Sequence, residues 1–499
     1  MTDTGIEEPT LHVNPGDTLN ITVTNNTPMQ PFGETFTAPN CGDSTVQFTP
    51  PANGIASVGA SVNIHYHGTN VTPQCGGDNV TRTLINPGPG STFQYSFTFP
   101  TDEPPGLYWY HPHVHGLAER DLLGGATGAL VVDGIQNMQP AVSGLRQRIL
   151  VIRDQPQLQG AAEGPGNCGI DVPFQDISVN YVPIDSNATF NPKGKLTNIT
   201  FTPAVLHMET GETQFWRVTN STADTILDLQ VLYDGVPQTL QIAGIDAVPV
   251  NSQDGTEPGT LIPVKRYRLP VAGRVEFLVK APSSTVKVAR LVTNNINNGP
   301  QGDCDPTRPI FNIVLTADTV PDALASADSV GNSTGFSTSG QRFGGLSTQP
   351  VSATRTFQFS EIQPTQFFIT QVSAGQQPTL FDNNNPPAVV TTQGSVEQWI
   401  IQNIAQENHE FHMHQIHFLV QSQDNFEANG NAQAPAITGQ FADMIEIPFW
   451  TGKNTVPIPD VKLLMDFRGM DIGDFVYHCH ILSHEDLGMM AIIKVLPKP

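Results

Sequence analysis

The segment His478-Cys479-His480 constrains the fold of this chain more than any other, because it places three metal-binding side chains in strict alternation. His484 follows shortly after it, and Met489 lies ten positions beyond the cysteine. In an extended strand, successive side chains point to opposite faces. The two flanking histidines therefore share one face and the cysteine lies on the other, so that one strand can serve two metal centres.

The side-chain types in this segment indicate copper. A thiolate, imidazoles and a more distant thioether are the ligands of a blue electron-transfer copper site. Cys479 fits that site, while His478 and His480 face a second centre. The sequence therefore predicts that electrons pass from one copper centre to another through a single residue step.

Three further histidine clusters strengthen this prediction. They are His65-Tyr66-His67, His111-Pro112-His113, and the group of His409, His412 and His414. Ten of the fourteen histidines lie in the four clusters. His412 and His414 share a face, whereas His409 has the opposite parity, as Cys479 has to its neighbours. One His-x-His pair alone would fit an exposed strand, but four clusters favour metal binding.

A weak threefold repeat organises the chain. The turn-like triplets starting at Gly16, Gly211 and Gly394 each precede an asparagine by nine residues, after an alternating strand pattern. The segment 110–113 also lines up with 477–480, with proline in place of the cysteine. Only the third repeat can therefore hold the blue copper, and the middle repeat is predicted to be a spacer.

The composition predicts an all-β protein. The 499 residues include 42 prolines and 44 glycines but only 14% charged residues, which is typical of many short strands joined by turns. We expect three consecutive Greek-key β-sandwich domains, at residues 1–140, 141–317 and 351–499. Residues 318–350, rich in serine and glycine, are predicted to be a linker.

The four clusters, in this order and across three repeats, resemble the multicopper oxidases, the family of laccases, bilirubin oxidases and bacterial copper oxidases. The resemblance covers essentially the whole chain and implies three cupredoxin-like domains with four coppers: one type-1, one type-2 and two type-3. By this match the type-1 ligands are His409, Cys479, His484 and Met489; the type-2 ligands are His65 and His412; the type-3 ligands are His67, His111 and His480 for one copper and His113, His414 and His478 for the other.

The resemblance implies a laccase-like enzyme that oxidises phenols and aromatic amines one electron at a time and reduces dioxygen to water. Three alternatives are a metallo-oxidase of ferrous, cuprous or manganous ions, a bilirubin-oxidase-like enzyme, and a copper carrier with a vestigial cluster. The metallo-oxidase would need carboxylates or methionines near His409 and His484. The absence of a methionine-rich insert argues against a dedicated cuprous oxidase. Residues 421–442 are a candidate substrate loop, and the alternative for them is a simple surface loop.

Two acids are candidates for proton relay to the oxygen-reducing centre. Glu485 directly follows a predicted type-1 histidine, and Asp78 shortly follows His67. The alternative for both is an ordinary exposed carboxylate. His115 and His417 lie next to the clusters but exceed the family's ligand set, so we expect them not to bind copper.

Cysteines, sequons and charge suggest where the protein works. The four cysteines other than Cys479 allow three connectivities, of which we expect Cys41–Cys75 with Cys168–Cys304; two disulfides would imply an oxidising compartment. Eight Asn-x-Ser/Thr sequons occur, at Asn20, Asn25, Asn70, Asn79, Asn187, Asn198, Asn220 and Asn332. No signal peptide is visible, so a leader was either removed or never existed, and we expect a secreted or periplasmic, glycosylated monomer. The net charge of −23 disfavours nucleic acid and anionic membranes as partners.

Overall fold

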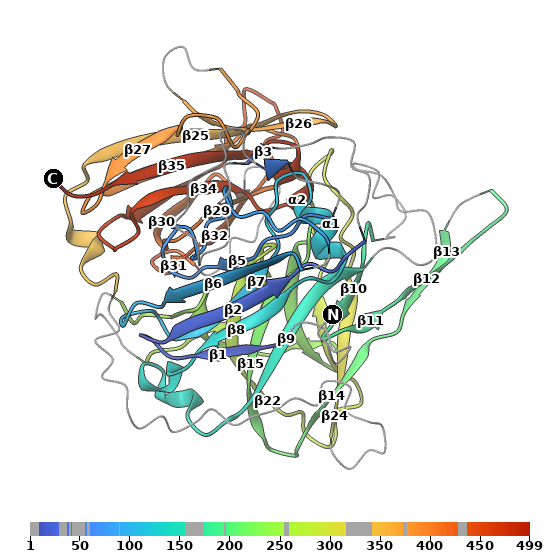
Figure 1. The fold of residues 1–499 in the computed structure, drawn as a ribbon. Helices are drawn as coiled ribbons and strands as arrows, with labels where there is room; N and C mark the ends of the chain where they lie inside the picture. The colour runs from blue at the N-terminus through green and yellow to red at the C-terminus, as the bar shows by residue number, and fades with distance from the viewer. Residues whose placement is uncertain are drawn as a thin grey trace.

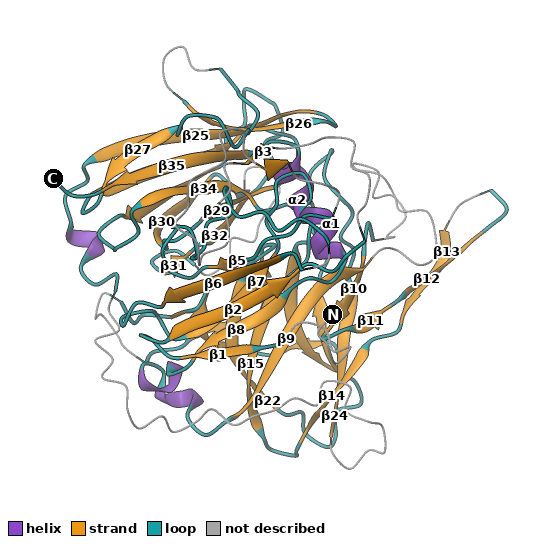
Figure 2. Cartoon of the chain, in the orientation of Figure 1, coloured by secondary structure: helices purple, strands orange, loops and turns teal. Residues whose placement is uncertain are grey.

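The computed structural model describes residues 9–28, 37–38, 41, 55–56, 60–88, 90–155, 173–193, 196–253, 259–315, 342–372, 377–427 and 437–499. Within these ranges the chain is almost entirely β (Figures 1 and 2). Its helices are short: α1 (Ala118–Leu123), α2 (Leu482–Asp486) and the 3-10 turns η1 (Ile135–Asn137), η2 (Pro140–Val142) and η3 (Leu346–Thr348). The predicted all-β class with three consecutive sandwiches is confirmed.

The first sandwich packs the sheet β1-β8-β7-β5 against the pair β2-β6. Its strands are β1 (Leu11–Val13), β2 (Thr18–Thr24), β5 (His65–His67), β6 (Thr92–Thr98), β7 (Gly106–His111) and β8 (Gly128–Val132), with the small pair β3 (Thr37–Ala38) and β4 (Ile55–Ala56). β6 alternates, burying Phe93, Tyr95 and Phe97. β7 is buried at every position, as expected for a strand covered on both faces.

The second sandwich consists of the sheet β11-β10-β9-β15-β22-β18-β19, with β20 on β18, and the sheet β14-β24-β23-β16-β17, with β21 on β16. Trp216 of one sheet packs on Phe311 of the other, with ring centroids 5.2 Å apart. The first sheet comprises β9 (Arg146–Gln155), β10 (Asp176–Val179), β11 (Val182–Ile184), β15 (Thr213–Asn220), β18 (Leu240–Ile245), β19 (Val248–Pro249), β20 (Ile262–Val264) and β22 (Arg274–Lys280). The second comprises β14 (Ala204–Met208), β16 (Leu227–Tyr233), β17 (Val236–Pro237), β21 (Tyr267–Leu269), β23 (Ala289–Thr293) and β24 (Arg308–Leu315). A hairpin of β12 (Ser186–Phe190) and β13 (Leu196–Phe201) projects from it (Figure 1).

The third sandwich packs the sheet β26-β25-β28-β33-β30-β31 against the sheet β27-β35-β34-β29-β32. Trp399 and Tyr477 meet between them at 5.2 Å. The first sheet comprises β25 (Ala353–Ile362), β26 (Gln366–Gln371), β28 (Val396–Asn403), β30 (Phe418–Asp424), β31 (Phe441–Ala442) and β33 (Asp460–Asp466). The second comprises β27 (Val389–Thr392), β29 (His409–Met413), β32 (Met444–Ile447), β34 (Gly473–Cys479) and β35 (Met490–Leu496).

The first and third sandwiches share one strand arrangement. β7 pairs antiparallel with β8, which pairs parallel with β1; β34 pairs antiparallel with β35, which pairs parallel with β27. The register places His65 opposite His111 and His412 opposite His478. The correspondence of segments 110–113 and 477–480 therefore extends to the neighbouring strands.

The domain boundaries themselves stay predictions. Each described sheet draws its strands from one stretch of the chain, 11–132, 146–315 or 353–496. Most of the predicted linker lies outside the described residues. Its end is packed rather than extended, because Phe343 and Leu346 are buried beside Leu464 in a small apolar cluster.

The disulfide and sequon predictions have mixed outcomes. Cys41 and Cys75 form a disulfide, as predicted; Cys304 is disulfide-bonded, and Cys168 lies outside the described residues. Four sequon asparagines are buried and therefore poor glycosylation sites: Asn25, Asn70, Asn79 and Asn220. Asn20, Asn187 and Asn198 are exposed, and Asn332 is not described. None of the described helices has the length and apolarity to cross a membrane.

Candidate metal centres

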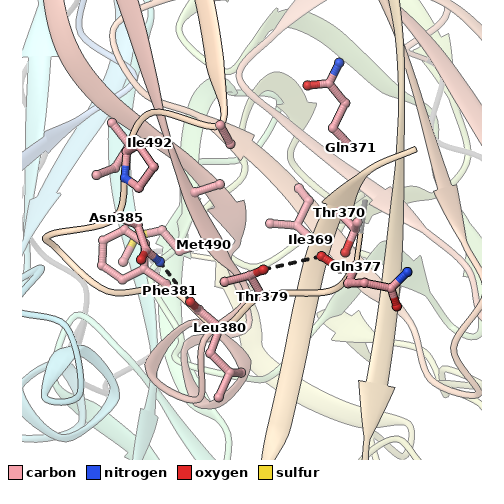
Figure 3. A pocket seen from close by; sticks show the side chains of 13 residues that line it. Ile369, Thr370, Gln371, Gln377, Thr379, Leu380, Phe381, Asn385, Met490 and Ile492 are labelled. Atoms are coloured by element: carbon pink, nitrogen blue, oxygen red, sulfur yellow. Dashed lines mark hydrogen bonds between the residues drawn. The ribbon is translucent and has the colours of Figure 1, made fainter. Parts of the chain in front are cut away.

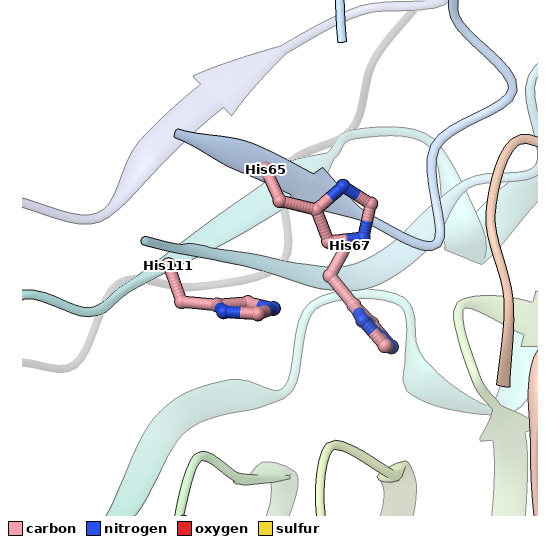
Figure 4. A group of neighbouring side chains, drawn as sticks. All are labelled: His65, His67 and His111. Carbon is pink, nitrogen blue, oxygen red and sulfur yellow. The ribbon is translucent and has the colours of Figure 1, made fainter. Parts of the chain in front are cut away.

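Eight buried histidines converge where the first and third sandwiches meet. β5 and the end of β7 supply four of them, and the ends of β29 and β34 supply the rest. They are His65, His67, His111, His113, His412, His414, His478 and His480, each no more than 2% exposed. Figure 4 shows three from the first sandwich with their rings turned toward one another. Three groups among the eight hold their ligand atoms within 4.8 Å of one another: His65–His67–His111, His65–His412–His414 and His113–His414–His478.

Several imidazole nitrogens in this cluster lie close to one another or have no hydrogen-bond partner. Nε2 of His478 lies 3.2 Å from Nε2 of His113 and 3.1 Å from Nε2 of His414. Nε2 of His65 and of His412 has no hydrogen-bond partner although both are buried. Unpaired buried polar atoms are costly unless something binds them. A set of electron-pair donors converging on shared points fits metal ions.

Burial also keeps these imidazoles in the form that binds metals. Desolvation, helped by neighbouring histidines, holds the pKa of His67, His412 and His414 well below its usual value. Neutral imidazole has the free lone pair that a metal requires. The donor set therefore fits copper, for which imidazole is a suitable ligand.

The second centre lies on the opposite face of β34. His409, Cys479 and His484 are buried together; Sγ of Cys479 lies 3.7 and 3.8 Å from the two Nδ1 atoms, which are 3.1 Å apart. The helix α2 brings His484 back toward the strand, and Met489 is fully buried behind it. Cys479 donates its backbone N–H to the carbonyl of Met489 at 3.0 Å.

The alternation predicted for 478–480 places the two centres one residue apart. His478 faces His113 and His414, while the next side chain, Cys479, faces His409 and His484. Burial raises the pKa of the Cys479 thiol well above its usual value. A bound cation would reverse that shift, because metals bind the thiolate.

Both candidate acids are buried, so the surface alternative is wrong for each. Asp78 Oδ2 lies 2.9 Å from Nδ1 of His65, and Oδ1 accepts the backbone N–H of Tyr66 at 3.0 Å. Glu485 bridges the two sandwiches, with Oε1 3.4 Å from Nδ1 of His113 and Oε2 3.1 Å from Nδ1 of His478. Burial would raise the pKa of Glu485, but its contacts with His113 and His478 lower it to about 2.

The sequence analysis missed a pair of glutamates beside the cysteine centre. Oε2 of Glu361 lies 3.5 Å from Nε2 of His409, and Oε1 of Glu407 lies 3.4 Å from Nε2 of His484. These nitrogens face away from Cys479. Burial and Glu361 raise the pKa of Glu407 to about 11, while its neighbours, His409 first, lower the pKa of Glu361 to about 2. The pair thus carries one proton and one negative charge at neutral pH. Neither glutamate belongs to a sequence motif.

A buried aspartate under the histidine cluster was also missed. Asp443 Oδ1 lies 3.4 Å from Nε2 of His67, and its backbone carbonyl accepts from Nδ1 of His412 at 2.8 Å. It is paired with Arg274 of β22. No motif marks it, because it lies in the bend between β31 and β32, in an otherwise apolar segment of the third sandwich.

The residues expected not to be ligands have other contacts. Nε2 of His417 lies 2.8 Å from the carbonyl of Asp246, and His115 packs edge-on against Phe381 at 4.9 Å. In the candidate substrate loop, Gln440 bonds to Asn251 of the second sandwich, and residues 428–436 lie outside the described residues.

A pocket of about 470 Å³ opens between β26, β35 and the segment 377–388 (Figure 3). Its apolar wall includes Ile369, Phe381 and Met490, and its polar residues are Thr370, Gln371, Gln377, Thr379 and Asn385. Met490 directly follows Met489 of the cysteine centre. The pocket therefore lies beside the segment that carries this methionine.

Comparison with known proteins shows which family and which relatives this chain resembles. Family models described as multicopper oxidase match residues 349–499 and 53–137. The multicopper oxidase LPR1 homolog 1 of Oryza sativa subsp. japonica is 23% identical over 505 residues, covering 91% of this chain and 77% of the relative. A laccase of Bacillus stratosphericus is 29% identical over 142 residues, 26% of each chain.

Solved structures show the same fold. McoA multicopper oxidase of Aquifex aeolicus aligns with a TM-score of 0.64 at 17% identity, covering 98% of this chain and 89% of that one. A Campylobacter jejuni multicopper oxidase, a metallo-oxidase, aligns with a TM-score of 0.61 at 20% identity, covering 98% and 85%. Sandwich domains with a cysteine–histidine centre and an adjoining histidine cluster define a copper-dependent oxidoreductase. The chain belongs to the multicopper oxidase family.

Proposed function

We propose that the chain oxidises a reducing substrate at a mononuclear type-1 copper and reduces dioxygen to water at a trinuclear cluster. The carrying observation is β34, where Cys479 faces one centre and His478 the other. Four copper ions per chain would supply the one-electron steps and hold the electrons that dioxygen reduction requires. A carrier protein would need only the cysteine centre, so the intact histidine cluster supports an oxidase.

The copper assignment is part of this proposal. The type-1 copper would be held by His409, Cys479, His484 and Met489; the type-2 copper by His65 and His412; the type-3 coppers by His67, His111 and His480 and by His113, His414 and His478. The contacts of Glu485 with one histidine from each sandwich support its role in moving protons at the cluster. Asp78 would orient His65 and hold a proton near it.

For the electron donor we propose phenols and aromatic amines. The apolar pocket bounded by Met490 and Phe381 suits a planar organic molecule, since small-molecule sites are mostly apolar with a few polar groups. A carboxylate near His409, Glu361, could accept the proton that a phenol loses on oxidation.

A second candidate donor is a metal cation. The feature that a metallo-oxidase would need, carboxylates beside His409 and His484, is present as Glu361 and Glu407. Carboxylate oxygens are preferred ligands of hard divalent cations, and the pair keeps a negative charge at neutral pH. A ferrous ion there would lie one imidazole away from the type-1 copper.

Crossed variants separate the two donors. E361Q/E407Q removes the carboxylates, A388F fills the pocket, and E427Q, at an exposed glutamate, controls for charge. For a metallo-oxidase, kcat/KM for ferrous iron falls about 100-fold in E361Q/E407Q and is kept in A388F. For a laccase-like enzyme, A388F instead lowers kcat/KM for a dimethoxyphenol. Loss of both activities in E427Q as well would contradict both assignments.

We also propose that the protein is secreted or periplasmic and monomeric. The Cys41–Cys75 disulfide supports an oxidising compartment. The exposed sequons at Asn187 and Asn198 lie on the projecting hairpin β12–β13, where a glycan meets no packed neighbour. Intact-mass measurement before and after deglycosylation tests whether these sequons carry glycans.

A further inference from the structure

The second sandwich, which contributes no candidate ligand, reaches the histidine cluster through one buried arginine. Arg274 starts β22 and is fully buried. Its Nη1 donates to Oδ1 of Asp443 at 2.7 Å, and its Nη2 donates to the other carboxylate oxygen. Its Nε donates to the carbonyl of Leu107 in the first sandwich at 3.3 Å. One guanidinium thus touches all three sandwiches.

The partner of Arg274 contacts two predicted ligands from different sandwiches. Oδ1 of Asp443 lies 3.4 Å from Nε2 of His67, and its carbonyl accepts from Nδ1 of His412. The hydrogen bond to the carbonyl leaves Nε2 of His412 for the cluster, and the carboxylate lies beside Nε2 of His67, which leaves Nδ1 of that ring for the cluster. The position and charge of Asp443 therefore determine how the two rings are presented.

Asp443 is fixed from several sides, which leaves it one orientation. Asp246, also of the second sandwich, accepts the backbone N–H of Asp443 at 3.3 Å and that of Arg274 at 2.8 Å. His417 lies 3.4 Å from its second carboxylate oxygen. A Cβ on Gly68, which follows His67 with φ +82°, would lie 2.4 Å from both the guanidinium and the carboxylate. The packing at this point admits only glycine.

We propose that Arg274 is a positioning residue for the trinuclear copper cluster, acting through Asp443 on His67 and His412. The inference rests on the proposed function and would give the middle repeat, predicted to be a spacer, a part in holding the cluster. Arginine suits the role because its planar fork holds both carboxylate oxygens at once. Without it, Asp443 would be a buried carboxylate free to turn away from the two rings.

A second arginine of the same sandwich provides a matched control. Arg268 donates to both oxygens of Glu446 in the third sandwich, each at 2.7 Å, and both residues are buried. Glu446 also accepts from the side-chain amide of Asn408 at 2.9 Å, and this partner is not an imidazole. R268Q thus removes an equivalent buried pair between the same two sandwiches without touching a predicted cluster ligand.

The experiment compares copper-loaded R274Q, R274K and R268Q. We expect R274Q to keep the blue type-1 band but to bind cluster copper about 10- to 100-fold more weakly, with an altered type-2 spin-resonance signal. R274K keeps the positive charge but not the planar fork. Its affinity for cluster copper and its type-2 signal should therefore lie between those of R274Q and wild type. R268Q should match wild type in copper per chain and type-2 signal, even if its melting temperature falls.

The blue band reports folding independently of the cluster. If R274Q lacks it, D443N, which preserves the side-chain shape, is judged by the same readouts. A type-2 signal and copper count in R274Q and D443N equal to those of R268Q would overturn the positioning role. A wild-type chain without cluster copper would instead contradict the proposed function, so the two failures are distinguishable.

Discussion

Strands β7 and β34 occupy equivalent places in the first and third sandwiches but lead into different residues between their two histidines. Each pairs with the histidine strand of its own sandwich, and each carries one histidine of the shared cluster near its end and leads into a second. Between the histidines β7 continues into Pro112, whereas β34 has Cys479. The same local structure therefore builds half of the cluster on both sides.

The surroundings of that position also differ. His409 lies three residues before His412, and the same step before His65 reaches Val62; His484 lies four residues after His480, and the same step after His113 reaches Leu117. Leu117 is fully buried and Val62 packs against the apolar core. The same strand arrangement therefore holds apolar side chains in the first sandwich where the third sandwich holds the ligands of the cysteine centre.

Replacing the thiolate should have the largest effect. We expect C479S to lose the blue band and to lower substrate oxidation by at least about 1,000-fold, because the sulfur is the link between the centres. The type-2 spin-resonance signal should persist, since the cluster histidines lie on the other face. P112S, at the equivalent place in β7, should retain the blue band. A blue band in C479S would show that Cys479 is not the thiolate ligand and would contradict this comparison of β7 and β34.

Removing the carboxylate shared by the two strands should have the next largest effect. Glu485 touches His113 after β7 and His478 of β34, so E485Q should lower dioxygen turnover about 100-fold. Reduction of the type-1 copper by substrate under anaerobic conditions should keep its rate. Oxygen consumption equal to wild type at every pH would show that Glu485 relays no proton.

Changing the axial residue should shift a potential rather than abolish activity. A thioether ligand stabilises oxidised copper, so M489L should raise the type-1 reduction potential. The neighbouring Met490 points the opposite way, into the pocket, so M490L should leave the potential unchanged. Redox titration of the blue band measures both variants. Equal reduction potentials in M489L and wild type would show that Met489 is not an axial ligand of the type-1 copper.

The smallest effect concerns the contact between the first sandwich and the third. Burial raises the pKa of Glu103 from 4.5 to about 7, although Arg342 opposes the shift. The folded state then holds more protons than the unfolded state between these values, so this acid costs stability as pH rises through that window. E103Q should therefore gain up to about 3 kcal/mol relative to wild type between about pH 4.5 and pH 7. Melting temperatures that differ by a constant amount at all pH values would contradict this.

The sequence predicted those features of the site that depend on the alternation of side chains along a strand. His478 and Cys479 had to face opposite ways once they lay in a strand, and four histidine clusters pointed to the residues that meet at the cluster. Arg274, Asp443, Glu361 and Glu407 could not be found this way. They reach the centres from another sandwich, from a strand without a motif or from connections between strands, and only tertiary packing determines their neighbours.

The burial of Asp78 and Glu485 also escaped the sequence. Local pattern gives the parity of a side chain but not what covers it. Both acids are covered by elements distant in the chain, as the bond from Gln415 to Asp78 shows. The sequence therefore gives the candidates for proton transfer, and the structure excludes the exposed alternative.

The central claim is that one strand joins a type-1 copper to a three-copper cluster. Its most direct test is copper counting on the pure protein combined with absorption and spin-resonance spectra. The structure predicts four coppers per chain, an intense blue thiolate band and a separate type-2 signal. One copper per chain with a blue band and no type-2 signal would contradict the account, because it would leave the eight buried histidines without their metal.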